Sequence, residues 1–258
     1  MFNFLKKRET LQEKIETTPQ EDFNDIYPVA EYFRNETGVT FEKQISILKS
    51  KVTSFCKHRD IYSFSQLLES IKSNASLKQE LIDYLTTNET YFYREFKQIE
   101  KLVSLVKNAN ASVQILCAPS STGEEPYSIA IALLEAGVNA NKFSITAVDI
   151  NSEAVEKAKK AIYAERNIRN LTPEILQKYF TDDGELYSLS NEIKRVVTFK
   201  IVNIFDDSFK SLGKFDYIFS RNMLIYFDKE TKLKAKGILE SLRKSAEHEV
   251  FFGHADLF

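Results

Sequence analysis

The sequence has 258 residues, of which 43% are hydrophobic and 28% charged, and its formal net charge is −2 at pH 7. This composition is typical of a globular protein that can form a core, and the small net charge argues against nucleic-acid binding through a basic field. The widely separated Cys56 and Cys117 argue against a disulfide framework or a metal site. Since no apolar run reaches membrane length and no signal-peptide core opens the chain, we expect a cytoplasmic protein that does not insert into a membrane.

The first part of the chain has a helical pattern. Residues 1–27 mix charged and polar side chains, and we interpret them as a loosely held lead-in segment. Residues 28–85 predict an all-helical domain, and residues 86–107 a linker segment followed by one further helix, because apolar residues recur there at helical spacing. The apolar faces are Phe41, Ile45, Leu48, Val52 and Phe55; Phe64, Leu67, Leu68 and Ile71; Leu77, Leu81 and Leu85; and Phe96, Ile99, Leu102, Val103 and Val106.

Beyond residue 108 the pattern changes to strands that alternate with helices. Strands are predicted at 113–117, 143–148, 215–219 and 249–252, and helices at 127–134, from about 152 to 162, from 173 onward and at 229–242. Residues 186–190 and 193–202 predict a hairpin, so that a small β-hairpin is inserted at about 181–202. The alternation predicts an α/β fold with a doubly wound, mostly parallel sheet over residues 108–258. In such sheets ligands bind beyond the carboxyl ends of the strands.

The segment CAPSSTGEEPYS follows the first of these strands and opens a helix. Small residues let backbone amides approach a ligand, and a helix N-terminus is electropositive. The alternative is a capping box that joins Ser121 to Glu124 or Thr122 to Glu125. Two carboxylates in the first turn disfavour a pyrophosphate and favour a cationic ligand, such as one that carries an amino group and a sulfonium.

Polar residues follow other strands of the predicted sheet. Asp149 ends the second strand, where a carboxylate in nucleotide-binding folds accepts hydrogen bonds from ribose hydroxyls; its alternative role is a helix N-cap. Asn203 can contact an adenine edge or hold a turn. Arg221 and Asn222 follow the strand at 215–219, with Tyr226 shortly after, and their alternatives are an ion pair with a carboxylate for the arginine and core packing for the tyrosine.

The segment LTTNETYFYRE at 85–95 joins the helical and α/β regions. It interleaves polar and aromatic residues, a mixture that a simple linker does not need. Asn88, Thr90 and Arg94 are hydrogen-bond donors in it. We therefore expect this segment to close over a ligand held by the sheet.

Taken in order, LTTNETYFYRE, STGEEPYSIAIAL, AVDINSEAVEKAKKAIY, VNIFD and FDYIFSRNMLIYFD resemble the chemoreceptor glutamate methyltransferase (CheR) family over about residues 40–256. The resemblance implies a Rossmann-like methyltransferase sheet at 108–258, S-adenosylmethionine as methyl donor and S-adenosylhomocysteine as product. It implies an enzyme of chemotaxis adaptation, a monomer that O-methylates glutamate side chains on the cytoplasmic helical domain of chemoreceptors.

The resemblance also implies roles for individual residues. Arg94 and Tyr226 correspond to catalytic positions, Tyr226 beside the transferred methyl group. Residues that correspond to donor-binding positions are Asn88, Thr90 and Arg94 in the linker, Glu124 and Glu125 near the methionine amino group, Asp149 at the ribose, Asn203 and Ile204 at the adenine, and Ser220, Arg221 and Asn222 along the pocket.

Several positions depart from the family pattern. Phe92-Tyr93 replaces a Phe-Phe pair, residues 244–248 replace a Pro-Gly-Gly turn, and His254-Ala-Asp256 replaces His-Ser-Glu. The sequence also stops before a terminal strand pair, so that either it is shortened or one sheet edge is exposed. Residues 180–202 are a few residues shorter than in members whose hairpin binds a receptor tail peptide, and we expect this enzyme to need no such peptide.

Residues 35–80 hold seven Lys or Arg against five Asp or Glu. The resemblance implies a basic helix face that meets glutamate-rich receptor helices, and the alternative is a solvated face. Two other functions stay open: a methyltransferase with another protein or a small molecule as acceptor, and a non-catalytic sensor of S-adenosylmethionine or S-adenosylhomocysteine.

Overall fold

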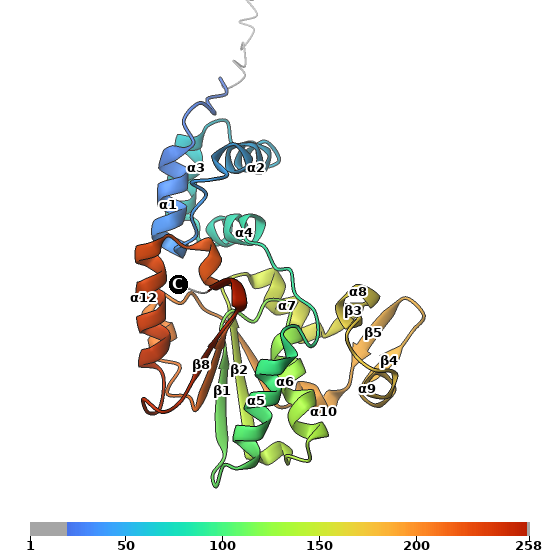
Figure 1. Ribbon diagram of the computed structural model, residues 1–258. Helices are drawn as coiled ribbons and strands as arrows, with labels where there is room; N and C mark the ends of the chain where they lie inside the picture. Colours follow the sequence, from blue (N-terminus) through green and yellow to red (C-terminus); the bar gives the residue numbers. More distant parts are fainter. Residues whose placement is uncertain (1–19, 257–258) are drawn as a thin grey trace, which may run out of the picture.

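The structure is a computed structural model that describes residues 20–256. Its first part is a helical region with its own core of aliphatic and aromatic side chains (Figure 1). Its helices are α1 (Tyr27–Thr37), α2 (Ile45–Lys57), α3 (Phe64–Ser73) and α4 (Ala75–Leu85). The predicted apolar faces are those that α2, α3 and α4 bury. Pro28 lies in the first turn of α1, where its missing N–H costs no helical hydrogen bond.

The predicted lead-in segment lies partly outside the described residues, since the structure describes none before residue 20. Its last residues are not loosely held. The Asp22 N–H donates to the Tyr62 carbonyl at 2.8 Å, and the Phe23 ring packs edge-on against Phe64 at 5.1 Å between centroids. Apolar contacts of this kind fix a segment that its polar composition alone would leave free.

The second part is built on a parallel sheet in the order β6-β2-β1-β7-β8. Its strands are β1 (Val113–Cys117), β2 (Phe143–Asp149), β6 (Val197–Ile201), β7 (Tyr217–Ser220) and β8 (Val250–Phe252). All four pairings are parallel, so every strand ends at the same edge. The doubly wound α/β prediction is therefore confirmed.

Helices cover both faces of this sheet (Figure 1). One core contains side chains of α5 (Phe96–Lys107) and α6 (Glu124–Glu135) with Ile115 and Phe219. The other contains side chains of α11 (Asp207–Lys210) and α12 (Lys229–Ser241) with Leu116 and Ile218. Neighbouring strand residues thus point to opposite layers, as the period of two in a strand requires.

A smaller antiparallel sheet in the order β3-β5-β4 lies beside the main one. Its strands are β3 (Ile162–Ala164), β4 (Phe180–Asp182) and β5 (Leu186–Leu189), and the helices next to them in the sequence are α7 (Ser152–Lys160), α8 (Glu165–Ile168), α9 (Pro173–Tyr179) and α10 (Asn191–Lys194). Short 3-10 turns within residues 20–256 are η1 (Ala140–Lys142), η2 (Leu224–Tyr226) and η3 (His254–Asp256). As predicted, Thr172 caps α9, with Pro173 at its first position.

Three details predicted for this region are wrong. The hairpin joins β4 to β5 across Asp183, Gly184 and Glu185, whereas residues 197–201 pair with β2 of the main sheet. The predicted hairpin of residues 186–190 and 193–202 required a turn at residues 191 and 192, and Asn191 opens α10 instead. Local alternation does not specify a partner strand, and the Asp-Gly turn signal was the stronger one. Residue 162 is also strand rather than helix, because Ala161 takes a left-handed conformation that ends α7.

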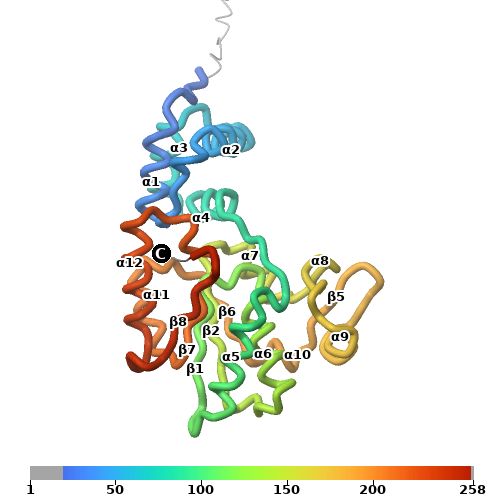
Figure 2. Tube along the Cα trace, in the orientation of Figure 1, coloured from blue at the N-terminus to red at the C-terminus, as the bar shows by residue number. Residues whose placement is uncertain are grey.

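The helical region is fastened to the carboxyl edge of the main sheet at two places (Figure 2). On α4, the Asp83 carboxylate accepts hydrogen bonds from the Ser152 N–H at 2.7 Å and from its hydroxyl, at the start of α7. Just after α1, Val39 forms a β-bridge with Phe227, and Arg34 in the last turn of α1 pairs with Asp228 at 2.8 Å. No helix within residues 20–256 is long and apolar enough to cross a membrane.

Candidate active site

A cavity of about 430 Å³ lies where the carboxyl edge of the main sheet, the linker and the helical region meet. It is of the size that encloses a small-molecule ligand. Of the predicted site residues, the following line it: Asn88, Thr90, Arg94, Glu125, Asp149, Asn203, Ile204, Arg221, Asn222 and Tyr226. Glu124 and Ser220 do not.

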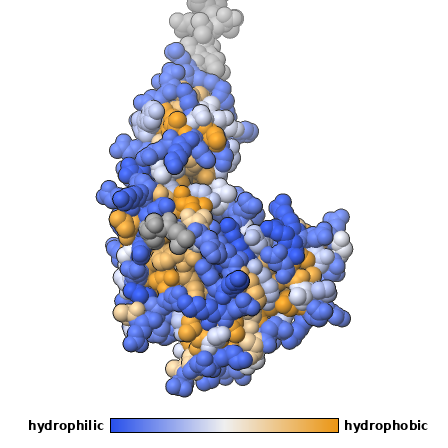
Figure 3. All heavy atoms as spheres, in the orientation of Figure 1, coloured by the Kyte–Doolittle hydropathy of each residue, from blue (hydrophilic) through white to orange (hydrophobic). Residues whose placement is uncertain are grey.

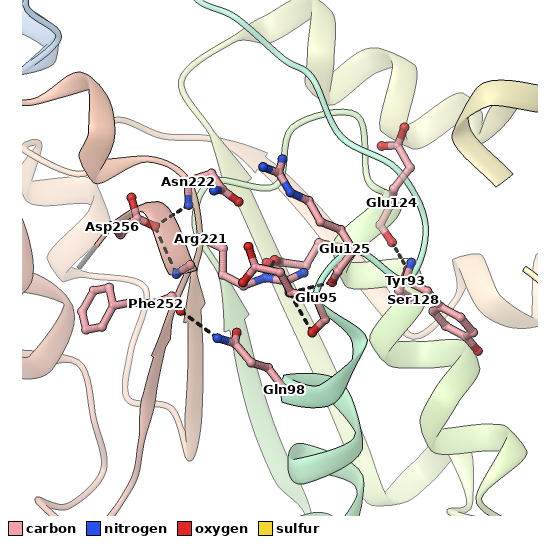
Figure 4. Close-up of polar contacts among 12 residues, drawn as sticks. Tyr93, Glu95, Gln98, Glu124, Glu125, Ser128, Arg221, Asn222, Phe252 and Asp256 are labelled. Atoms are coloured by element: carbon pink, nitrogen blue, oxygen red, sulfur yellow. Dashed lines mark hydrogen bonds and ion pairs between the residues drawn. The ribbon is translucent and has the colours of Figure 1, made fainter. Parts of the chain in front are cut away.

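The linker forms one wall of the cavity along residues 85–91 and again at Arg94. Phe92 anchors it: the ring is fully buried and the N–H donates to the Asn167 carbonyl at 2.8 Å. The next N–H, of Tyr93, donates to Ser128 Oγ at 3.0 Å (Figure 4). Left-handed φ angles of 58° at Tyr93 and 49° at Glu95 then turn the chain into α5. The linker therefore lies over the sheet edge, as expected from the sequence.

Glu125 and Arg221 form a buried ion pair on the cavity wall. The arginine Nε donates to Glu125 Oε2, and its Nη1 donates to the Arg94 carbonyl at 2.7 Å, so the pair also holds the linker. The predicted alternative for Arg221, pairing with a carboxylate, is thus realised within the cavity itself. Glu125 Oε1 is buried and has no hydrogen-bond partner among the described residues. A buried carboxylate oxygen of this kind is suited to accept a hydrogen bond from a ligand ammonium group.

Glu124 points the other way, which corrects its predicted place in the site. Its two oxygens accept hydrogen bonds from Thr122 Oγ1 at 2.6 Å and Asn167 Nδ2 at 2.7 Å. Neither predicted capping box forms, because the N-cap of α6 is Gly123, at φ 95° and without a side-chain cap. The first amides of α6 are therefore not capped by a side chain, as a ligand-binding helix N-terminus requires.

Asp149 ends β2 with a buried carboxylate at the cavity. It accepts hydrogen bonds from the Ser121 N–H at 2.7 Å and the Asn151 N–H at 2.9 Å. Burial raises the pKa of Asp149 to about 6, against the opposing effect of these hydrogen bonds. The N-cap of α7 is Asn151 and not Asp149, so the capping alternative is excluded. Each oxygen keeps a lone pair that a ribose hydroxyl can use.

Asn203 and Ile204 line the cavity next to the end of β6. The Asn203 amide is occupied at both ends: Nδ2 donates to the Glu36 carbonyl at 2.6 Å and Oδ1 accepts from the Phe205 N–H at 3.0 Å. The turn-holding alternative for Asn203 is therefore present, and one N–H of its amide is left for a ligand. Ile204 supplies an apolar surface of the kind on which a flat ring packs.

The residues at the end of β7 and beyond it differ in whether they reach the cavity. Ser220 is fully buried, and its place among the residues that line the pocket was predicted wrongly. Arg221, the first residue after β7, does line the cavity. Tyr226 is 38% exposed, which excludes core packing. Burial raises the pKa of the Tyr226 hydroxyl, which Arg94 partly offsets, so the hydroxyl is a donor at neutral pH.

Asp256 orders part of the site, a structural role that the sequence did not predict. Its buried carboxylate accepts hydrogen bonds from the backbone N–H groups of Asn222, Gly253 at 3.1 Å and Ile225 at 3.2 Å, and so holds the segment that carries Tyr226 (Figure 4). A Cβ on Gly253 would lie 2.9 Å from the Asn222 nitrogen, which explains the glycine. The sequence held only a weak signal, an acid in the short turn η3 that follows the last strand.

The helical region supplies a further part of the wall that the sequence did not predict. Residues from the end of α1, from the segment between α1 and α2 and from α2 line the cavity, among them Phe41, Ile47 and Lys51. Ile47 is 50% exposed and lies with Tyr226 and Ile225 among the exposed apolar residues of the site. The face of the molecule seen in Figure 3 is mostly hydrophilic, with scattered apolar patches. The mouth of the cavity is therefore partly apolar.

The residues present fit a ligand that carries an amino-acid group and a nucleoside. A partnerless carboxylate oxygen lies on Glu125 in the uncapped first turn of α6, and the acid Asp149 ends β2. At the carboxyl edge of a parallel sheet, where such folds bind nucleosides, this arrangement fits S-adenosylmethionine, which carries both groups.

Comparison with known proteins specifies the kind. The family model described as CheR methyltransferase, SAM binding domain, matches residues 88–258, and the chain belongs to this family. The chemotaxis protein methyltransferase of Campylobacter jejuni (serotype O:2) is 37% identical over 224 residues, which cover 86% of this chain and 84% of that protein. That of Escherichia coli K12 is 35% identical over 204 residues, 77% of this chain and 71% of that protein. The protein is thus a methyltransferase that uses S-adenosylmethionine.

Among solved structures, magnesium protoporphyrin IX methyltransferase from Synechocystis with bound S-adenosylmethionine is similar at 16% identity and a TM-score of 0.33, over 62% of this chain and 63% of that one.

Proposed function

We propose that this enzyme transfers the methyl group of S-adenosylmethionine to glutamate side chains on the cytoplasmic helical domain of chemoreceptors. The proposal draws on membership of the CheR family and on relatives named chemotaxis protein methyltransferase. The observation that carries it is the pairing of a donor cavity with a mouth formed by Arg94, Tyr226 and the helical region.

In this proposal the cavity residues hold and orient the donor. Asp149 accepts hydrogen bonds from the ribose hydroxyls, and Glu125 accepts one from the amino group of the methionine part. The backbone amides at the start of α6 approach the carboxylate of the methionine part. Ile204 and the neighbouring Asn203 border the adenine. Asn88, Thr90 and Arg94 enclose the donor from the linker side. S-adenosylmethionine supplies an electrophilic methyl group when bound.

The acceptor glutamate needs no general base. Its ordinary pKa of about 4.3 leaves it ionised at neutral pH. The enzyme must hold a carboxylate oxygen in line with the methyl carbon, and such positioning contributes up to roughly 7–11 kcal/mol in favourable cases. Arg94 orients the entering carboxylate, and Tyr226, protonated at neutral pH, donates a hydrogen bond to it. Both act without the tight ion pair that would trap the carboxylate.

We assign three proposed units to the chain: an acceptor-binding helical domain at 28–85, a linker segment and helix at 86–107, and the catalytic domain from 108. Much of the basic face of the helical domain is engaged internally, since Lys57, Arg59 and Lys78 form ion pairs and Lys49 donates to a backbone carbonyl. Lys51 instead lines the cavity. The acceptor contact is therefore centred on Lys51.

A charge reversal tests this contact. Lys51→Glu should raise the KM for receptor and weaken its dependence on ionic strength, because the lost attraction is electrostatic. Lys72→Glu, on α3 and outside the cavity, is the matched control. If the two substitutions have equal effects, Lys51 makes no specific contact with the receptor, and the basic face is a solvated one.

We also propose that no receptor tail peptide is required, because the β4–β5 hairpin has only a three-residue connection between its strands. Titration of a receptor C-terminal peptide measured by calorimetry tests this, and tight binding would overturn it. We further propose that the enzyme works as a monomer in the cytoplasm, which sedimentation and cell fractionation check.

The deciding experiment for the proposed function is transfer of labelled methyl groups from S-adenosylmethionine to receptor-containing membranes. Base-labile label on the receptor supports glutamate methylation. Label on another protein or on a small molecule would indicate a different acceptor. Binding of S-adenosylhomocysteine with no transfer at all would indicate a sensor.

A further inference from the structure

A second recess, of about 410 Å³, lies on the other side of the linker from the donor cavity. We call it the Arg166–Arg169 recess; besides these arginines it is lined by Thr87, Asn88, Glu89, Thr90, Tyr91 and Asn167. All five of its linker residues also line the donor cavity. The two hollows therefore share one wall that is a single chain thick.

The recess is basic and its arginines are available. Arg166 and Arg169 are both exposed, and neither forms an ion pair with a carboxylate among residues 20–256. Arg169 donates to the Arg166 carbonyl at 2.8 Å, which orders its side chain. Glu89 is the one acid in the lining. Two guanidinium groups at one polar hollow favour a carboxylate ligand.

Tyr91 connects this recess with the catalytic mouth. The Arg169 guanidinium lies over its ring at 3.8 Å from the centroid, and the Arg94 guanidinium at 5.7 Å. Both arginines are thus placed by the same ring. A carboxylate at Arg169 would lie one aromatic side chain away from the residue proposed to orient the acceptor glutamate.

We propose that the Arg166–Arg169 recess binds an acidic side chain of the acceptor protein, on the same helix as the glutamate that enters the donor cavity. The inference rests on the proposed function, since it concerns the acceptor. Because one helical turn advances 5.4 Å, a second acid one or two turns away spans a wall of one chain. The recess then sets which glutamate of a helix is aligned with the cavity.

The test uses the full chain, S-adenosylmethionine and a purified cytoplasmic fragment of a chemoreceptor. In the double variant Arg166→Glu with Arg169→Glu, the KM for the fragment should rise about tenfold, the size expected for a charged contact of moderate strength. Both kcat and the affinity for S-adenosylhomocysteine should stay within about twofold. The matched control is Arg195→Glu, whose side chain also donates to a nearby backbone carbonyl, that of Asn191, but lies outside both hollows.

A second arm identifies the ligand. Each acid of the fragment one or two turns from the modified glutamate is replaced by glutamine. With the unaltered enzyme, one of these replacements should raise the KM for the fragment as much as the double substitution in the enzyme does. With the double variant, the same replacement should raise the KM no further. Additive effects, an unchanged KM, or an equal effect of Arg195→Glu would overturn the inference. Competition by inorganic phosphate without any effect of the acid replacements would also overturn it, in favour of a free anion. Absence of any methylation by the unaltered enzyme would instead refute the proposed function.

Discussion

The buried carboxylate of Asp149 makes donor binding dependent on pH in a calculable way. Burial raises the pKa of this group from 3.8 to about 6 in the folded protein. If only the ionised form accepts both ribose hydroxyls, the dissociation constant is multiplied by 1 + 10^(pKa − pH). The constant for S-adenosylhomocysteine should therefore be nearly unaffected at pH 7.5 and about tenfold larger at pH 5.

The same group has the opposite effect on the stability of the free protein. Because its folded pKa is raised, the folded state binds more protons than the unfolded state between about pH 4 and 6. Its contribution to stability is therefore present below pH 4 and lost as the pH rises through 6, by on the order of 3 kcal/mol. Between pH 4 and 6, donor affinity and this contribution thus change in opposite directions.

Calorimetry with S-adenosylhomocysteine at pH 7.5, 6 and 5 measures the first effect, and urea unfolding without ligand the second. Asp149→Asn should bind the ligand weakly at every pH and show no slope. Glu124→Gln is the control, because burial raises the pKa of Glu124 as well but its carboxylate does not reach the cavity. A flat affinity in the unaltered protein, or a slope that disappears in Glu124→Gln, would refute the reasoning.

Three further substitutions test the site. Arg94→Ala should lower kcat by about two to three orders of magnitude while circular dichroism stays unchanged, and normal turnover would remove Arg94 from the proposed chemistry. Tyr226→Phe should lower kcat by about tenfold with little change in affinity for S-adenosylhomocysteine, since one hydrogen bond to the acceptor is lost; a loss confined to donor affinity would contradict its role. Asp83→Ala removes the acceptor of the Ser152 hydrogen bonds and should lower the free energy of unfolding by about 2 kcal/mol and weaken donor binding, measured by urea unfolding and calorimetry; unchanged values for both would show that this attachment is dispensable.

Local patterns in the sequence were sufficient for most elements of the fold. Helical spacing is a property of neighbouring residues, and α2 to α5 follow it. Pairing between strands is not local, so the strand at 197–201 was assigned to a hairpin although it pairs with β2. The end of α7 at Ala161 depends on one left-handed residue that is not glycine, and composition gives no sign of it.

The candidate site was predictable where a residue directly follows a strand. Asp149 and Arg221 are of this kind, since parallel topology alone brings strand ends together. Which of two adjacent glutamates faces the cavity depends on how α6 begins at Gly123, and the spacing could not decide between Glu124 and Glu125. The role of Asp256 depends on contacts with residues about thirty positions earlier, which no motif specifies.

The two attachments of the helical region affect how the cavity can exchange its contents. One joins α4 to the start of α7, and the other joins the segment after α1 to the residues after η2, so that the cavity lies between them. Because the helical region is attached on both sides of the cavity, it cannot rotate away from the sheet about a single hinge. Ligands then pass through the mouth beside Tyr226, where an acceptor protein would sit. Turnover should accordingly be ordered, with the methylated protein departing before the spent donor, and S-adenosylhomocysteine should inhibit competitively against S-adenosylmethionine alone.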